Sequence, residues 1–354
     1  MNTITQKISI EKVKTSKIDQ VDFDNLAFGS VFTDHMLVCD FRNGAWETPK
    51  ITPYQPISLE PSAKIFHYGQ SIFEGMKAYK DTANKIWFFR PFDNHKRLNI
   101  SANRMAIPEI PEEYFMEGLK ALVELEEAWI PQKDGSSLYI RPFIFASGKG
   151  FHASPADEYK FIICLAPSGS YFSGKVKVLI EEKYSRSANG GVGYAKAGGN
   201  YAGQFYPTQL AAKKGYSQVI WTDDNNHEYI EEAGAMNIFI RIDDTLITGP
   251  TSDRILDGIT RKSILQIAED EGINTEVRKI TVNEVVEAAK NGRLKEMFGA
   301  GTAAVISPIS TFGHRDVDYD LPELEKSYAT RLKKRITDIQ YNRAEDPFGW
   351  RHGL

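Results

Sequence analysis

The segment GYAKAGGNYA, residues 193–202, holds a single lysine, Lys196, among small residues. Glycine and alanine neighbours leave the lysine amine room to react, and an amine in such a setting can form an imine with a carbonyl compound. Lys196 is therefore a candidate Schiff-base residue. Most lysines are solvated surface residues, so this segment does not assign a function by itself.

A second informative segment, YIEEAGAMNIF, spans residues 229–239. It places a carboxylate at the start of a β-rich run, where the carboxylate could face the ring nitrogen of a cofactor held by Lys196. Glu231 and Glu232 are both candidates, and they point to opposite faces of an extended strand. Together the two segments indicate pyridoxal 5′-phosphate as the cofactor.

Length and charge narrow the range of functions. At 354 residues the chain exceeds the size at which one core usually keeps growing, so we expect two domains that share a cleft. The net charge of −4, with acids and bases interspersed, offers no basic stripe to nucleic acid and no cationic face to anionic lipid. This charge pattern predicts neither nucleic acid nor membrane partners. Residues 1–20 lack the apolar run of a signal peptide or membrane span, which predicts a cytoplasmic protein.

Cysteines and histidines give no sign of a disulfide or a metal site. Cys39 and Cys164 each lie in an apolar, strand-like run, which predicts small buried side chains. The seven histidines show no metal-binding spacing, so we expect no metal.

Hydrophobic periodicity predicts a mixed α+β chain. Turn-forming residues cluster at 167–174, so we expect this segment to link a smaller N-terminal domain, residues 1–166, to a larger C-terminal domain, residues 175–354. Helical spacing is found at 92–105, 112–130, 204–214, 260–271, 282–290 and 322–341. Strands are expected at 137–146, 160–166, 175–181, 218–222, 236–242 and 245–248.

Two further segments bear on phosphate binding. Residues 257–261, DGITR, precede a helical run, and backbone N–H groups with the Thr260 hydroxyl at a helix N-terminus favour a phosphate. An ordinary N-cap role for Thr260 is the alternative. Residues 299–304, GAGTAA, fit a loose dinucleotide fingerprint, but that motif must open a helix, whereas residues 305–309 are mostly β-branched and contain a proline. A nicotinamide dinucleotide site is therefore excluded.

In amino-acid sequence and in order, these segments resemble the branched-chain amino acid aminotransferases, which are fold-type IV pyridoxal-phosphate enzymes. Residues 67–79, HYGQSIFEGMKAY, resemble the same family. Sequence that resembles this family extends from residues 32–36 to residues 301–303. The resemblance implies a two-domain fold like that of D-amino acid aminotransferase, and a homodimer. It also implies amino transfer between leucine, isoleucine or valine and 2-oxoglutarate in a ping-pong cycle, giving branched 2-oxo acids and glutamate.

The resemblance also assigns residues. Lys196 would hold the cofactor and move a proton during catalysis, and Glu232 is preferred over Glu231 for the ring nitrogen. Tyr201 would donate to the phenolic oxygen of the cofactor. The phosphate-binding positions of the family match Arg97, Ile259, Thr260 and Thr302. Its substrate-pocket positions match Phe28, Tyr68, Phe73, Tyr139, Arg141, Tyr171, Ala235 and Ala303.

Tyr139 and Arg141 alternate along one predicted strand, so both side chains can enter the same pocket. An aromatic wall beside an adjustable cation suits a site that accepts an aliphatic side chain in one half-reaction and the γ-carboxylate of glutamate in the other. Without the resemblance, each of the aromatic residues would be assigned to packing. The alternatives are a D-amino acid aminotransferase, an aminodeoxychorismate lyase and a non-catalytic pyridoxal-phosphate-binding protein. The first two families lack the complete sequence motifs that this chain has at residues 73–78 and 195–201.

Overall fold

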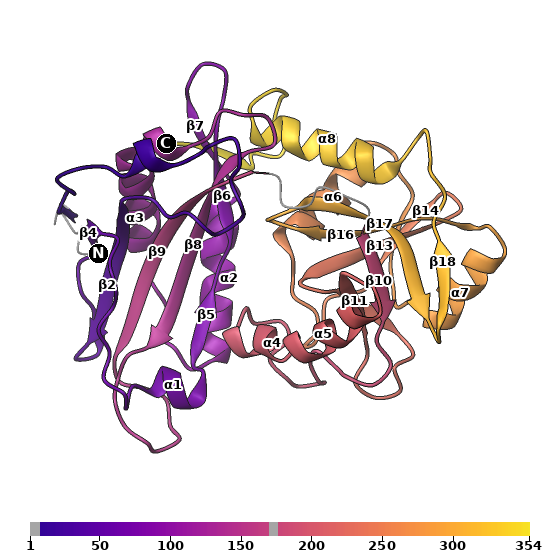
Figure 1. Ribbon diagram of the computed structural model, residues 1–354, viewed down its shortest axis with the longest axis horizontal. Helices are drawn as coiled ribbons and strands as arrows, with labels where there is room; N and C mark the ends of the chain where they lie inside the picture. The colour runs from indigo at the N-terminus through magenta and orange to yellow at the C-terminus, as the bar shows by residue number, and fades with distance from the viewer. Residues whose placement is uncertain (1–7, 170–175) are drawn as a thin grey trace. The chain divides into compact units, whose positions relative to one another are not determined.

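The computed structural model describes residues 8–169 and 176–354. Contacts divide these residues into two units (Figure 1). Unit 1 comprises residues 8–169, 195–198 and 340–354, and unit 2 comprises residues 176–194 and 199–339. Each unit is built on one sheet with helices, which confirms the α+β prediction. The predicted linker lies outside the described residues from position 170 to 174, and the division into domains 1–166 and 175–354 stays a prediction.

Unit 1 has a sheet of ten strands among its described residues, in the order β1-β4-β2-β9-β8-β6-β7-β19, with β3 paired to β2 and β5 paired to β8. The long antiparallel pair β8 and β9 forms its centre, and its inward side chains join the hydrophobic core. The strands are β1 Ser9–Ile10, β2 His35–Arg42, β3 Ala45–Trp46, β4 Lys50–Pro53, β5 Ser71–Phe73, β6 Met76–Lys80, β7 Ile86–Phe89, β8 Ser137–Ala146, β9 Tyr159–Ser168 and β19 Arg351–Gly353.

Two amphipathic helices, α2 Pro91–Arg104 and α3 Glu112–Leu125, pack on this sheet (Figure 1). Helix α3 buries Phe115, Leu119 and Leu122 completely, at the one-turn spacing that the sequence shows. The prediction that this helix reaches residue 130 is wrong, because the chain leaves the helix after Leu125 and continues in a short 3₁₀ turn. The other helical segments of unit 1 are α1 Lys64–Tyr68, η1 Ile18–Gln20 and η2 Glu127–Trp129.

In unit 2 the path β12-β11-β10-β17-β16-β13 closes on itself, because β12 also pairs with β13. Strand β10 lies between two parallel neighbours, β11 and β17, and the pairings of β16 with β13 and β17 are antiparallel. The strands are β10 Val176–Ile180, β11 Gln218–Thr222, β12 Ile230–Ala233, β13 Met236–Ile242, β14 Thr245–Thr248, β15 Thr275–Val277, β16 Leu294–Gly301, β17 Val305–His314 and β18 Val317–Asp320.

Helices cover this closed sheet: α5 packs on β11, and α6 and α7 pack on β16. Helix α7 begins where its sequence predicts, because the Thr281 hydroxyl accepts a hydrogen bond from the Glu284 N–H at 3.0 Å. The helix expected from residue 322 instead begins at Tyr328. The helices are α4 Gly198–Ala202, α5 Phe205–Lys213, α6 Ile259–Asp270, α7 Val282–Lys290 and α8 Tyr328–Gln340.

Two segments join unit 1 through pairing that their place in the sequence does not suggest. Ala197 forms an isolated antiparallel bridge with Ile72. Strand β19 pairs with β7 at the edge of the sheet, with Arg351 opposite Phe89. Unit 1 therefore contains the lysine segment and the last strand of the chain as well as its own first part.

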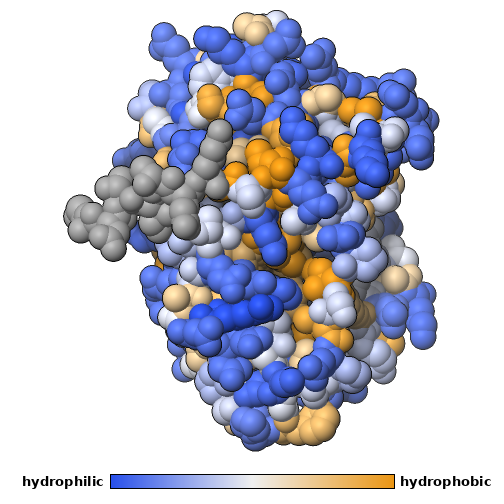
Figure 2. Space-filling model, turned by 90° about the vertical axis from the view of Figure 1, so that its left-hand side faces the viewer, coloured by the Kyte–Doolittle hydropathy of each residue, from blue (hydrophilic) through white to orange (hydrophobic). Residues whose placement is uncertain are grey.

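The surface of unit 1 is largely polar. Figure 2 shows a face on which hydrophilic residues predominate and hydrophobic residues gather in small patches. Phe66 and Phe151 are the most exposed large apolar side chains of this unit, at 62% and 71%. Among the described residues, no helix combines the length and apolar character needed to cross a membrane.

Candidate functional site

Lys196 is fixed to unit 1 by its own backbone. Its N–H donates to the Ser101 hydroxyl on α2 at 2.9 Å, and its carbonyl accepts from the N–H of Phe73 at 3.0 Å. The side chain is partly buried, and its Nζ lies 4.7 Å from the centre of the Phe73 ring. The amine is therefore presented from a rigid segment and shielded on one side by an aromatic ring.

The same ring contacts a second cation. The Arg141 guanidinium lies 4.7 Å from the Phe73 ring centre and 5.2 Å from that of Tyr139, and its NH2 donates to the Tyr139 hydroxyl at 2.9 Å. Phe28 packs edge-on against Tyr139, with ring centres 4.8 Å apart. Four predicted pocket residues of unit 1 therefore form one cluster, with Arg141 held by aromatic rings and a hydroxyl and without a carboxylate contact among the described residues.

Glycine at position 75 makes the position of Tyr139 possible. A Cβ at Gly75 would overlap the Tyr139 hydroxyl, so a larger residue would push that ring out of the cluster. The close approach explains why a glycine stands between two strands that are otherwise well packed.

The predicted phosphate ligand Arg97 is held by Glu74, which sequence reasoning did not single out. Arg97 donates from Nε and NH2 to the two Glu74 oxygens, at 2.8 and 2.9 Å, and Asn94 donates to the same carboxylate at 2.7 Å. Burial opposes ionisation of Glu74, but Arg97, Lys196 and Asn94 outweigh it and hold the pKa of this carboxyl below its ordinary value. The bidentate geometry fixes the orientation of the guanidinium.

In unit 2 the two neighbouring glutamates of β12 have different partners. Glu232 forms an ion pair with Arg186 at 2.8 Å, and its other oxygen accepts from the Asn237 amide at 3.1 Å. Glu231 pairs with Arg254, and burial nevertheless raises the pKa of the Glu231 carboxyl. Both glutamates are buried, so the geometry distinguishes them by partner and not by exposure.

The N-terminus of α6 has the character of an anion site. The helix begins at Ile259, so Thr260 lies in its first turn, and the N-cap is Gly258, which offers no capping side chain. No acidic residue lies in that turn, and Ile259 and Thr260 are buried. The N-cap interpretation of Thr260 is therefore wrong, while the prediction of donors at a helix N-terminus is consistent with the structure.

The strand register in the sheet of unit 2 shows which further predicted positions lie opposite one another. Glu232 lies opposite Asn237, and Asn237 lies opposite Ala300, two residues before Thr302. Residues 302–304 form the turn into β17, a strand, which confirms that the glycine-containing segment 299–304 opens no helix. Ala303 is partly buried in this turn.

The remaining predicted residues are placed as follows. Tyr201 lies in α4 and is partly buried, and Ala235 is exposed in the turn between β12 and β13. Tyr68 ends α1, is 42% exposed and donates its hydroxyl hydrogen to the Phe151 carbonyl, which holds it at the surface of unit 1. Tyr171 lies outside the described residues.

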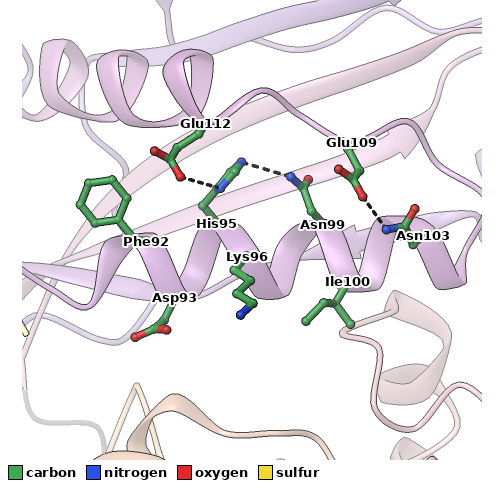
Figure 3. Close-up of a pocket in the computed structure, with 9 residues that line it drawn as sticks. All are labelled: Phe92, Asp93, His95, Lys96, Asn99, Ile100, Asn103, Glu109 and Glu112. Atoms are coloured by element: carbon green, nitrogen blue, oxygen red, sulfur yellow. Dashed lines mark hydrogen bonds and ion pairs between the residues drawn. The ribbon is translucent and has the colours of Figure 1, made fainter.

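A surface pocket of about 470 Å³ lies along the other side of α2 (Figure 3). Its His95 ring faces Glu112 at 3.9 Å and lies 3.1 Å from the Asn99 amide. None of the residues predicted to bind cofactor or substrate lines it. The lining residues are Phe92, Asp93, His95, Lys96, Asn99, Ile100, Asn103, Glu109 and Glu112.

Sequence reasoning missed the residues that orient the predicted ones. Glu74 and Ser101 support Arg97 and Lys196, and Arg186 and Asn237 support Glu232. A glutamate inside the mainly apolar residues 72–79 was the available signal for Glu74. Arg186 lies in a polar loop with no pattern of its own. Among residues 8–169 and 176–354 no group of three or more His, Cys, Asp or Glu side chains is arranged to hold a metal.

Comparison with known proteins identifies the family. Residues 71–312 match the model of the amino-transferase class IV family. The chain is 43% identical to branched-chain-amino-acid aminotransferase 2 of Bacillus subtilis (strain 168) over 350 residues, covering 98% of this chain and 96% of that one.

The comparison with solved structures indicates the same family. The branched-chain aminotransferase of Thermoproteus uzoniensis, solved with norvaline, has a TM-score of 0.75 and 25% identity, covering 90% of this chain and 99% of that one. A branched-chain amino acid aminotransferase from T.th., solved with N-(5′-phosphopyridoxyl)-L-glutamate, has a TM-score of 0.71 and 25% identity, with 89% and 97% covered. The chain therefore belongs to the class IV aminotransferases and, within them, to the branched-chain amino acid aminotransferases, a family of fold-type IV enzymes.

Proposed function

We propose that this enzyme moves the amino group between leucine, isoleucine or valine and 2-oxoglutarate in two alternating half-reactions, with pyridoxal 5′-phosphate bound through Lys196. One observation carries the proposal: the Lys196 amine and the Arg141 guanidinium each lie 4.7 Å from the centre of the Phe73 ring. A reactive amine and a cation able to recognise a side-chain carboxylate thus share one aromatic wall.

The residues of each unit, taken separately, fit this cofactor. Unit 1 offers the Lys196 amine and an Arg97 guanidinium that Glu74 holds in place. Unit 2 offers the N-terminus of α6, whose uncapped first turn suits a phosphate, and the buried carboxylate of Glu232, which suits a protonated ring nitrogen. When bound, the cofactor supplies an electron sink for the negative charge that develops on the substrate Cα.

Each side chain of the proposed site would then have its own role. The Lys196 amine would accept and hold the proton of the substrate Cα, while Phe73 and Tyr139 would keep water from the amine. Arg141 pairs with the γ-carboxylate of glutamate in one half-reaction and stays on the Tyr139 hydroxyl when an aliphatic side chain is bound. The residues proposed to hold the phosphate are Arg97, Ile259, Thr260 and Thr302. Tyr201 is proposed to donate to the cofactor's phenolic oxygen, and Phe28, Tyr68, Tyr171, Ala235 and Ala303 to line the substrate pocket.

We also infer a homodimer. The Phe66 and Phe151 side chains of unit 1 are 62% and 71% exposed, and the Phe151 ring packs edge-on against His67 at 5.0 Å. A surface of this kind is typical of a face that a second chain covers. Sedimentation of the wild type and of Phe151→Ser tests this, and a monomeric wild type would refute it. The cytoplasm stays a prediction from the sequence.

Borohydride reduction of the cofactor-loaded enzyme, followed by peptide mapping, tests the central assignment. We expect the pyridoxyl label on Lys196, and no label in Lys196→Ala, while the matched control Lys149→Ala is labelled like the wild type. A label on Lys77 or on any lysine other than Lys196 would refute it.

The absorbance of the loaded enzyme separates the proposed reaction from its alternatives. L-Leucine should convert the spectrum to that of the amino form of the cofactor, and 2-oxoglutarate should reverse the change. Conversion by D-alanine and not by L-leucine would indicate a D-amino acid aminotransferase. A spectrum that no amino acid changes would indicate a protein that binds the cofactor without transferring amino groups.

A further inference from the structure

Each of the two adjacent glutamates of β12 has its own arginine. Arg254 serves Glu231 and also pairs with Asp224 at 3.2 Å. Arg186 pairs with Glu232, and the side chains of these two residues are only 3% and 4% exposed. The more deeply buried of the two ion pairs therefore belongs to the glutamate proposed to face the cofactor ring.

Arg186 is itself held by backbone carbonyls. Its NH1 donates to the Arg254 carbonyl at 2.8 Å and to the Gly193 carbonyl at 3.3 Å, and its NH2 lies 3.4 Å from the latter. A Cβ at Gly193 would meet the backbone of residue 254, so the two segments approach each other closely at the point where Arg186 bridges them. The backbone carbonyls thus hold the Arg186 guanidinium in place independently of its contact with Glu232.

The second oxygen of Glu232 is fixed from the other side. The Asn237 amide donates to it at 3.1 Å and to the Leu256 carbonyl at 2.8 Å. The carboxylate is therefore held between a cation and an amide, both of which are anchored to the backbone. This arrangement gives the carboxylate one orientation.

We propose that Arg186 is a positioning residue that keeps the Glu232 carboxylate anionic and oriented toward the ring nitrogen of the cofactor. The inference rests on the proposed function and adds a residue to it. A buried carboxylate without a cation would take up a proton, whereas a guanidinium in contact favours the anion. Only an anionic Glu232 can keep the ring nitrogen protonated and the cofactor an effective electron sink. Arg186 touches neither substrate nor cofactor in this role.

The test uses enzyme loaded with pyridoxal 5′-phosphate that carries ¹⁵N in its ring, because the ¹⁵N chemical shift reports whether the ring nitrogen is protonated. The variants are Arg186→Met, Arg186→Lys, Glu232→Gln and the double variant Arg186→Met/Glu232→Gln. Arg254→Met is the matched control, since it removes the same charge from the neighbouring pair.

We expect Arg186→Met to move the ¹⁵N shift toward that of the neutral ring, as Glu232→Gln should, and to lower kcat for leucine by about ten- to a hundredfold, the range for losing an interaction with a charged partner. Arg186→Lys should restore most of the protonated signal, and Arg254→Met should match the wild type. The double variant should be no slower than Glu232→Gln alone, because the two residues act as one unit.

A protonated ring nitrogen in Arg186→Met, or losses in kcat that multiply in the double variant, would overturn the inference. If Arg186→Met does not fold, Arg186→Lys and the double variant decide: a neutral ring in Arg186→Lys, or a double variant slower than Glu232→Gln, also overturns it. A wild type that takes up no cofactor, or takes it up at a lysine other than Lys196, would instead show that the proposed function is wrong.

Discussion

Replacement of Glu74 by glutamine should destabilise unit 1 strongly. Glu74 is completely buried and accepts from Nε and NH2 of Arg97 at 2.8 and 2.9 Å, from Asn94 at 2.7 Å and from the N–H of Gly75 at 3.2 Å. Glutamine has the same shape, but it keeps one acceptor oxygen and turns an NH₂ group toward these donors. Removing one partner of a buried ion pair leaves the other charge uncompensated, so we expect the free energy of unfolding to fall by about 3–5 kcal/mol.

Urea unfolding of the cofactor-free protein measures this loss. Tryptophan fluorescence reports mainly on unit 1, because four of the five tryptophans, at 46, 87, 129 and 350, belong to it. The matched control is Glu127→Gln, which breaks an ion pair with Lys80 of the same 2.8 Å length in which Glu127 is 51% exposed. An exposed pair contributes about 0–1 kcal/mol, so the control should unfold almost like the wild type.

The pH dependence gives a second check. The pKa of Glu74 is held below its ordinary value of 4.5, so the stability that its charge supplies is present above the unfolded pKa and is lost as the pH falls through the lower folded value. The difference between wild type and Glu74→Gln should therefore be constant near neutral pH and shrink below about pH 4.5. A loss of less than about 1 kcal/mol at pH 7, or a difference that grows in acid, would refute the reasoning.

Three further outcomes follow from the structure. Arg141→Met should lower kcat/KM for glutamate and 2-oxoglutarate by about ten- to a hundredfold and change leucine much less; equal losses in steady-state assays of both half-reactions would contradict a role in carboxylate recognition. A Cβ in Gly258→Ala would overlap Asn237 Oδ1, so cofactor affinity measured by titration should fall about tenfold, and unchanged affinity would show that the Asn237 amide is not needed. Burial raises the pKa of Cys39 to about 12 and that of Cys164 to about 11, so both thiols should react with a disulfide reagent at pH 8 only after unfolding in urea, and rapid reaction of the native protein would contradict this.

Elements with a strong local pattern could be predicted from the sequence closely. Strands β8, β11, β13 and β14 and helix α7 have the predicted bounds, and α2, α5 and α6 differ by one residue at each end. In these segments hydrophobic period, capping residues and turn residues agree with one another, so local information is sufficient.

The errors occur where a distant side chain ends or begins a helix. Helix α3 stops at Leu125 because Glu126 turns inward, where it bonds the His35 ring and accepts from the N–H of Asp34 at 3.3 Å. Helix α8 starts at Tyr328, where Glu296 of β16 accepts from the N–H of Tyr328 at 2.7 Å and the Ser327 hydroxyl accepts from the N–H of Thr330 at 3.1 Å. His35, Asp34 and Glu296 are far in sequence from the helix ends that they contact, so periodicity alone extends both helices too far.

The candidate site shows the same division. Lys196, Glu232 and the α6 N-terminus could be proposed because their neighbours in sequence have a recognisable pattern. The orienting residues Glu74 and Arg186 depend on pairing between segments far apart in the chain, which a single sequence does not display. Cys164, predicted to be buried, is only partly so; Lys160 and Cys164 are the two incompletely covered residues of β9.

The way unit 1 is assembled from three pieces of chain has a consequence for synthesis on the ribosome. Residues 340–354, which supply β19 and pair with β7, are made after all of unit 2, so the first unit to emerge keeps an open sheet edge until the second has been translated. During that interval the growing chain exposes β7 as a site for mispairing with other nascent chains. Holding the last segment away from β7, for example by tethering a stalled ribosome just beyond it, should therefore favour aggregation through the strand that β19 covers in the finished protein.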